Sequence, residues 1–266
     1  PRPLLGEDGG LLGRPLPVAG GDPQSLCRGR RDHDVQPSER AYCGRKIMMQ
    51  LLQPKWKPGL MIALFYLINF GLWELIAPII SDEWASFSVY LILFVVTIVL
   101  FRKELSYRWK EWKEKHLKSK SFYGNLVLWL ILDMVLSAVL LAAATLFNLD
   151  ILPQNNENVK SQFAAIPQFL TAVQTCIFAP VIEEMTFRYS MIGVPGTKRQ
   201  TILLCFISII LFDWIHIFQF KEFFYYLAPA ILLTTFYARY KNVWASILLH
   251  SAINILGTAA LLFNIL

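Results

Sequence analysis

Long hydrophobic stretches alternate with short polar segments along most of the chain. A helix needs roughly 20 apolar residues to cross a bilayer, because the hydrocarbon core is about 30 Å thick and an α-helix rises about 1.5 Å per residue. Seven stretches come within a few residues of this length: about 59–80, 84–101, 123–148, 163–192, 201–218, 222–238 and 243–265. The pattern predicts an all-α fold, a polytopic membrane bundle of about seven transmembrane helices.

The first 47 residues follow a different pattern. They are rich in glycine and proline and show no hydrophobic periodicity, so they should not pack a core. We predict a disordered tail over 1–47 and a polytopic membrane domain over 48–266. The first methionines are Met48 and Met49, and we expect the folded protein to begin there, with the tail outside the native product.

Composition and charge support a membrane protein. Hydrophobic residues make up 55% of the chain and charged residues 17%, against about 45–50% and about 25% in average proteins. The net charge is +6, and the basic residues lie between the apolar stretches. Basic residues in that position suit lipid headgroups, so the expected partners are membrane lipids and not nucleic acids.

The basic residues also predict an orientation. With the N-terminus in the cytoplasm, sixteen lysines and arginines from residue 45 onward fall on the cytoplasmic side, and only Lys160 and Lys221 on the other. The lysine-rich, asparagine-bearing core is typical of a bacterial protein, so we expect the plasma membrane of a bacterium.

The basic segment 102–120 between the second and third stretches has its own pattern. It predicts an amphipathic helix on the membrane surface, with Tyr107, Trp109 and Trp112 at the interface. A solvated helix that only stops translocation is the alternative.

Three charged residues interrupt the fourth stretch. Glu183, Glu184 and Arg188 would together cost on the order of 8–10 kcal/mol in a bilayer if they were unpaired. Glu184 and Arg188 are four residues apart on one helix face and can form an ion pair. Glu183 is turned about 100° away, toward another neighbour. Pro180 lacks an N–H, so a bend there can admit water.

Polar residues also occur in the fifth and seventh stretches. Phe212 and His216 are four residues apart, and so are His250 and Asn254. Carboxylates, imidazoles and an amide that converge from three helices can activate a water and stabilise an oxyanion. For straight parallel helices the depths do not agree, because Glu183 lies about 13 Å, His250 about 10 Å and His216 about 22 Å from the cytoplasmic ends.

These motifs, EExxxR, FxxxH and HxxxN in this order, resemble those of the CPBP intramembrane proteases. That family includes the CAAX-processing type II endopeptidases and the bacteriocin self-immunity proteins. The resemblance covers a protease-like core at about 163–260, including YARYKNVWASILLHSAIN from Tyr237 to Asn254. It implies hydrolysis of a peptide bond in a membrane-associated protein or peptide substrate.

The resemblance also implies roles for the site residues. Glu183 would be the general base on water, aided by His216, while His250 and Asn254 would donate to the oxyanion. Arg188 would hold Glu184, and Phe212 would pack beside His216. Glu183, His216 and His250 would suit zinc, but the histidines lack HExxH spacing, so we favour a glutamate-type hydrolase without a metal over a metalloprotease.

Simpler interpretations exist for each residue alone. The three charged residues can be a structural ion-pair cluster, each histidine a core residue, and Asn254 an interhelical hydrogen-bonding group. For the whole chain the alternative is a non-catalytic membrane immunity or binding protein, or a small transporter. A transporter should show repeats or broken helices in matching halves, and no internal repeat is evident.

Overall fold

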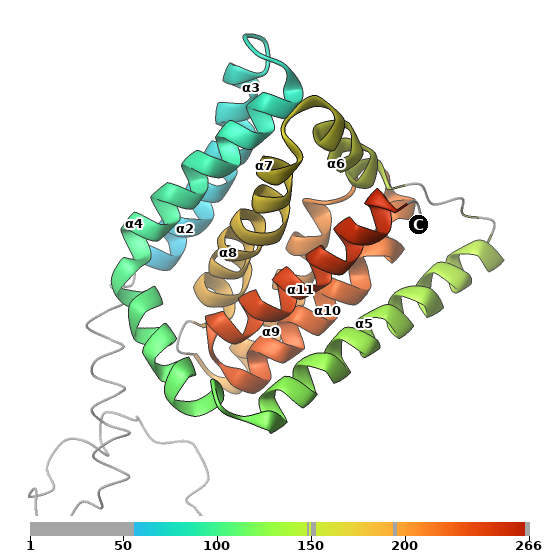
Figure 1. Ribbon diagram of the computed structural model, residues 1–266. Coiled ribbons are helices and arrows are strands. Elements are labelled where there is room, and N and C mark those ends of the chain that lie inside the picture. Colours follow the sequence, from blue (N-terminus) through green and yellow to red (C-terminus); the bar gives the residue numbers. More distant parts are fainter. Residues whose placement is uncertain (1–55, 148, 150–152, 194–195, 264–266) are drawn as a thin grey trace, which may run out of the picture. The chain divides into compact units, whose positions relative to one another are not determined.

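The protein is described by a computed structural model that covers residues 56–147, 149, 153–193 and 196–263. Within these ranges the chain forms helices and no strands, which confirms the predicted helical membrane bundle (Figure 1). The predicted tail 1–47 lies outside the described residues.

The first half of the described chain contains three long helical segments. The first is continuous and consists of α2 (Lys57–Tyr66), the π-helical η2 (Leu67–Leu72) and α3 (Trp73–Ile76). The other two are α4 (Asp82–His116) and α5 (Lys120–Leu146).

The second half holds the residues predicted to carry chemistry. A short helix, α6 (Gln154–Ala165), precedes a segment made of α7 (Gln168–Val173), η3 (Gln174–Phe178), α8 (Ala179–Glu183) and η4 (Glu184–Ile192). We call this segment, residues 168–192, the central helix. Three helices and one 3₁₀ turn follow: α9 (Lys198–Trp214), η5 (Phe220–Glu222), α10 (Phe223–Tyr240) and α11 (Val243–Leu262).

Four helical segments in the described part are long and apolar enough to cross a membrane: Lys57–Ile76, Asp82–His116, Lys120–Leu146 and Val243–Leu262. Each of the other predicted stretches also contains helix, but α9, for example, has only 17 residues. Seven membrane crossings therefore stay a prediction.

The predicted start of the fourth span, at residue 163, is wrong. Ile166 has extended backbone angles (φ −125°, ψ 161°) and ends α6. The cause is Pro167, whose ring clashes with a helical conformation of the preceding residue. The central helix therefore begins at Gln168 and packs against α2, α4, α9 and α11, which places its polar residues in the core.

The basic segment after the second stretch is helical, as predicted, but it continues α4 through a kink at Phe101. The assignment of Trp112 to the membrane interface is wrong, because its side chain is buried and lies edge-on to Phe122. Trp109, which is partly exposed, stacks on Trp112 and contacts Trp244. The rings of Trp109 and Trp112 therefore pack against other aromatic rings of the protein, whereas the sequence analysis placed both at the lipid interface.

Asn242 connects this extension of α4 to α11. Its Oδ1 accepts from Trp244 N (3.0 Å) and caps α11, and its Nδ2 donates to Arg108 O (3.0 Å). We expect Asn242→Ala to lower the free energy of unfolding by about 1–3 kcal/mol, since both the cap and a buried hydrogen bond are lost. Asn242→Ser keeps a capping oxygen but not the donor to Arg108 O, so its loss should be smaller. Equilibrium unfolding in mixed micelles measures both, and an unchanged Asn242→Ala would contradict this role.

Candidate active site

The central helix changes its hydrogen-bond register on both sides of the acidic pair. η3 and η4 are π-helical, and the short α8, which includes Pro180, lies between them. Proline has no N–H to donate, so the backbone ladder must be rearranged around it. π-helical turns within helices are frequent at functional sites. Glu183 ends α8 and Glu184 begins η4, and both side chains are buried.

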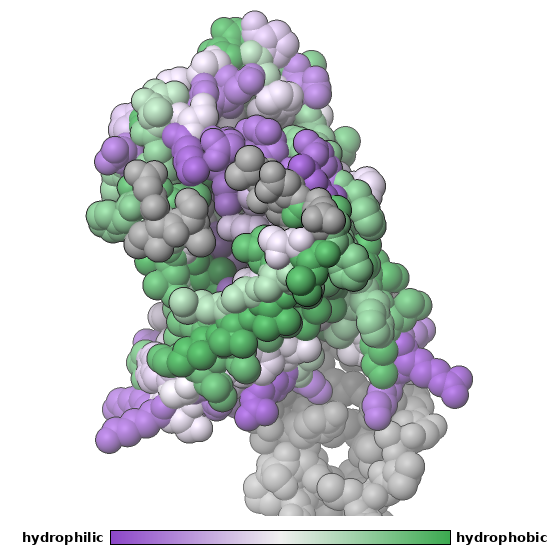
Figure 2. All heavy atoms as spheres, turned by 90° about the vertical axis from the view of Figure 1, so that its right-hand side faces the viewer, coloured by the Kyte–Doolittle hydropathy of each residue, from purple (hydrophilic) through white to green (hydrophobic). Residues whose placement is uncertain are grey.

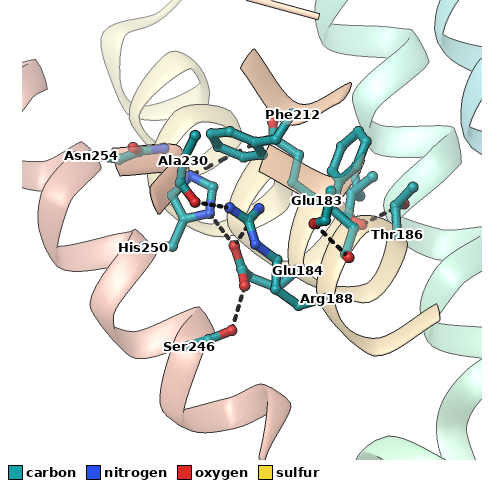
Figure 3. Close-up of polar contacts among 12 residues, drawn as sticks. Glu183, Glu184, Thr186, Arg188, Phe212, Ala230, Ser246, His250 and Asn254 are labelled. Carbon is teal, nitrogen blue, oxygen red and sulfur yellow. Dashed lines mark hydrogen bonds and ion pairs between the residues drawn. The ribbon is translucent and has the colours of Figure 1, made fainter. Parts of the chain in front are cut away.

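Glu184 is held by one ion pair and two hydrogen bonds (Figure 3). Its Oε1 lies 3.2 Å from Arg188 Nη1 and 2.9 Å from His250 Nδ1, and its Oε2 accepts from Ser246 Oγ. The predicted ion pair between Glu184 and Arg188 is therefore present. An ionised carboxylate buried in this way is stabilised by the hydrogen bonds and the opposite charge together.

Arg188 is fully buried beside aromatic side chains. Its guanidinium lies 4.1 Å from the ring centroid of Phe212, and Nη2 donates to Ala230 O (3.4 Å). A desolvated cation over an aromatic face gains electrostatic stabilisation. Phe212 also packs beside His216, with ring centroids 4.8 Å apart, as predicted, and beside His250 at 5.6 Å.

Glu183 faces His216 and His250, and it shares His250 with Glu184, which contacts the other nitrogen of that ring. Its Oε2 lies 3.7 Å from His216 Nε2 and 3.7 Å from His250 Nε2. Within the described residues this oxygen has no direct hydrogen-bond partner. At distances beyond about 3.5 Å, two polar groups commonly interact through a bridging water. The three side chains thus surround a point that suits one water molecule.

The other ring nitrogen of each histidine fixes its tautomer. His250 Nδ1 lies against a carboxylate, and His216 Nδ1 lies 2.7 Å from Phe212 O. Both partners only accept hydrogen bonds, so both Nδ1 atoms carry hydrogen. In the neutral rings each Nε2 therefore presents a lone pair toward Glu183. Three acceptors facing one another require a shared proton, or hydrogens from a bound water.

His216 does not lie inside a helix, and the prediction that the fifth stretch stays helical to residue 218 is wrong. α9 ends at Trp214, and His216 lies in the turn that follows. The depth disagreement is resolved as well, because His216 and Glu183 lie 3.7 Å apart despite it. The calculation assumed that His216 lies within a straight helix, whereas α9 ends at Trp214 and the following turn carries His216.

Asn254 lies near this group but makes a different contact. Its Nδ2 donates to Thr175 O on the central helix (2.8 Å). One of the two amide hydrogens is therefore committed to the backbone, while the other and Oδ1 stay available. Asn254 also lines the cavity described next.

A cavity of about 1370 Å³ opens beside these residues. Glu183, His216, His250 and Asn254 line it, together with residues of α3, α4, α5 and α6. Figure 2 shows hydrophilic side chains around a hollow, with hydrophobic residues covering the surface below it. An extended peptide segment would fit in such a volume.

Three side chains of the site have the chemistry of zinc ligands: Glu183, His216 and His250. Within the described ranges, no group of three or more histidine, cysteine or acidic side chains is placed closely enough to hold a metal ion as it stands.

The sequence analysis missed two side chains of the site. Ser246 donates to Glu184 and lies one turn before His250, so the four-residue spacing was a usable signal. Tyr226 of α10 stacks on the His216 ring, with centroids 5.1 Å apart. The sequence held no signal for that contact, because the two residues belong to different elements.

Comparisons with known proteins agree with this arrangement. Residues 165–256 match the family model described as type II CAAX prenyl endopeptidase Rce1-like. Two curated proteins of Lactococcus lactis subsp. lactis (strain IL1403) are similar. The UPF0177 protein YbdJ is 30% identical over 41% of this chain and 47% of its own length. The UPF0177 protein YbdI is 29% identical over 44% of this chain and 62% of its own length.

The chain therefore matches about half of the length of these relatives, and no solved structure matches it. The matched segment contains the central helix from residue 168 onward, α9, α10 and most of α11. The matched segment carries all six predicted site residues: Glu183, Glu184, Arg188, His216, His250 and Asn254. Residues 165–256 are thus similar to the Rce1-like domain of type II CAAX prenyl endopeptidases, and the chain that carries them is an integral membrane protein.

Proposed function

We propose that the protein is an intramembrane endopeptidase that hydrolyses a peptide bond of a membrane-associated protein or peptide by means of activated water. One observation carries the proposal. The carboxylate of Glu183 and two imidazoles converge at 3.7 Å in a cavity wall. The family of the matched segment supports the same reaction class.

Glu183 acts as the general base in this reaction. It accepts a proton from the water while the water oxygen forms a bond to the carbonyl carbon of the substrate. Glu183 then returns the proton to the leaving nitrogen as the C–N bond breaks. A positioned base of this kind contributes roughly 10²–10⁴-fold to a rate.

A proton on one of the two histidines supplies the positive charge that balances the buried group. Glu183, Glu184 and Arg188 together carry one net negative charge, so a single additional proton on a histidine makes the buried group neutral. A protonated His250 donates Nδ1–H to Glu184 and Nε2–H to the oxyanion that forms at the substrate carbonyl. The free amide hydrogen of Asn254 is a second donor, and Arg188 keeps Glu184 ionised and in place.

A comparison of membrane proteomes tests the function. New protein N-termini are measured in membranes of cells that make the protein and of cells that lack it. We expect one or a few cleavage sites at membrane-embedded or membrane-adjacent segments that depend on the protein. Identical sets of N-termini would contradict the proposal. The same data would show whether the substrates belong to a bacteriocin system of the bacterial plasma membrane.

Removal of metal ions tests whether the reaction requires one. We expect the cleavage rate in detergent micelles to change less than about twofold after dialysis against EDTA or 1,10-phenanthroline, because a carboxylate base needs no metal. A loss that is restored by zinc would contradict a glutamate-type mechanism and assign Glu183, His216 and His250 as ligands. A zinc peptidase treated in parallel confirms that the chelator acts in the same micelles.

A further inference from the structure

Asp133 of α5 is a buried carboxylate in the wall of the cavity, and the proposed reaction does not use it. It lies in the middle of α5, a helix long and apolar enough to span a membrane. A charged residue at such a position is costly, about 2.5–3.5 kcal/mol on insertion scales, and usually marks a functional group. Its side chain is 9% exposed, and Oδ1 has no hydrogen-bond partner within the described residues.

The face of α5 that carries Asp133 is turned toward the cavity. The α5 residues that line the cavity recur at spacings of three and four: Leu130, Asp133, Met134, Ser137, Ala138 and Leu141. This spacing defines one side of a helix. α5 packs on α10 and α11, and His250 of α11 lines the same cavity as Asp133. Asp133 therefore faces the space beside the proposed catalytic group.

The cavity differs in charge from the rest of the chain. The chain has 25 lysines and arginines and a net charge of +6. Among the described residues that line the cavity there is no lysine or arginine, and the two histidines are the only groups that can add positive charge. Five acidic residues line it: Glu74, Asp82, Glu83, Asp133 and Glu183. Clefts lined by one sign of charge concentrate ligands of the opposite sign.

We propose that Asp133 is a specificity-determining residue that binds a cationic side chain, lysine or arginine, of the peptide segment in the cavity. This inference rests on the proposed endopeptidase function, and it names the substrate class: a membrane-associated peptide with a basic residue near the cleaved bond. The ammonium or guanidinium group would donate to the unpartnered Oδ1, and the acidic residues at the cavity rim would attract it on entry.

Binding of a defined probe tests the proposal without hydrolysis. The full chain carrying Glu183→Gln is placed in uncharged dodecyl maltoside micelles. The probe is a capped ten-residue alanine–leucine peptide with one central lysine and a neutral fluorophore, and its partner probe has acetyl-lysine at the same position. We expect the lysine probe to bind at least about tenfold more tightly, the ratio that one charge-assisted hydrogen bond supplies.

Variants assign the preference to Asp133. Asp133→Asn should bring the two affinities within about twofold of each other, while Asp133→Glu should restore the preference because it keeps the charge. Glu114→Gln removes an exposed acid that does not line the cavity, so the preference should stay unchanged. Equal binding of both probes to the parent protein would overturn the proposal. A preference that survives Asp133→Asn would also overturn it.

Two further outcomes separate this inference from its alternatives. A phosphatidylethanolamine headgroup also presents an ammonium, so displacement of the lysine probe by that lipid would overturn the assignment to a peptide. If the protein without the Glu183→Gln change cleaves nothing while the lysine preference holds, the endopeptidase function fails and the binding site for a cation stands.

Discussion

Replacing Glu183 with glutamine is expected to lower the turnover number by about 10²–10⁴-fold, the usual contribution of a positioned general base. Glutamine has nearly the same size and shape, but its amide cannot accept a proton from water. Glu183 makes no direct hydrogen bond through Oε2 within the described residues, so the substitution breaks no structural contact of that atom. The folded protein should therefore be present in the membrane at an unchanged level.

The measurement is the rate at which the cleavage products found in the proteomic comparison appear, divided by the amount of protein in the membrane. Glu114→Gln is the matched control, since it makes the same chemical change at an exposed site on α4 and should alter the rate less than about twofold. Unchanged turnover in Glu183→Gln would exclude the general-base role. If the Glu183→Gln variant protected cells against a bacteriocin as well as the parent protein does, a non-catalytic immunity or binding protein would be the better interpretation.

Much of the contact pattern at the site could be predicted from the sequence, because it depends on spacing along one helix. The pairing of Glu184 with Arg188 follows from a separation of four residues. The separate direction of Glu183 follows from the rotation of about 100° between neighbouring residues. Both features are local, so they need no knowledge of which helices are neighbours.

Other features depend on tertiary structure and could not be predicted in this way. His216 meets Glu183 only because α9 ends at Trp214 and the following turn brings the ring back toward the central helix. Asp133 could not be assigned a role from the sequence, since hydropathy alone does not show which face of α5 borders a cavity. Trp112 was assigned to lipid because amphipathic helices have the same pattern whether they cover a membrane or a neighbouring helix.

The helix boundaries show the same limit. The start of the central helix was placed inside α6, because a hydrophobic stretch continues across Pro167 although the helix does not. The proline was a usable signal for this break. The continuity of α4 was not predicted, because the apolar stretch ends near residue 101 and the basic segment has the pattern of a separate amphipathic helix. In the structure the two form one helix with a kink at Phe101, and buried contacts of Trp112 and Asn242 hold its second half.

The largest effect on stability is expected from Arg188→Met. This change leaves Glu184 fully buried without its opposite charge, and breaking a buried ion pair on one side typically costs about 3–5 kcal/mol. It also removes the cation that lies over the Phe212 ring. Equilibrium unfolding in mixed micelles, or by steric trapping, measures the loss. A loss below about 1 kcal/mol, the value of an exposed pair, would contradict the buried-pair interpretation.

The double variant Glu184→Gln with Arg188→Met separates the structural role of this pair from its catalytic one. Without either charge, no buried ion is left uncompensated, so most of the lost stability should return. Turnover should stay low, because the Nδ1–H of His250 then faces a neutral amide that cannot stabilise a protonated ring. Recovery of both stability and turnover would show that Glu184 and Arg188 only hold the helices together. Recovery of stability alone would show that the same carboxylate also sets the charge of His250.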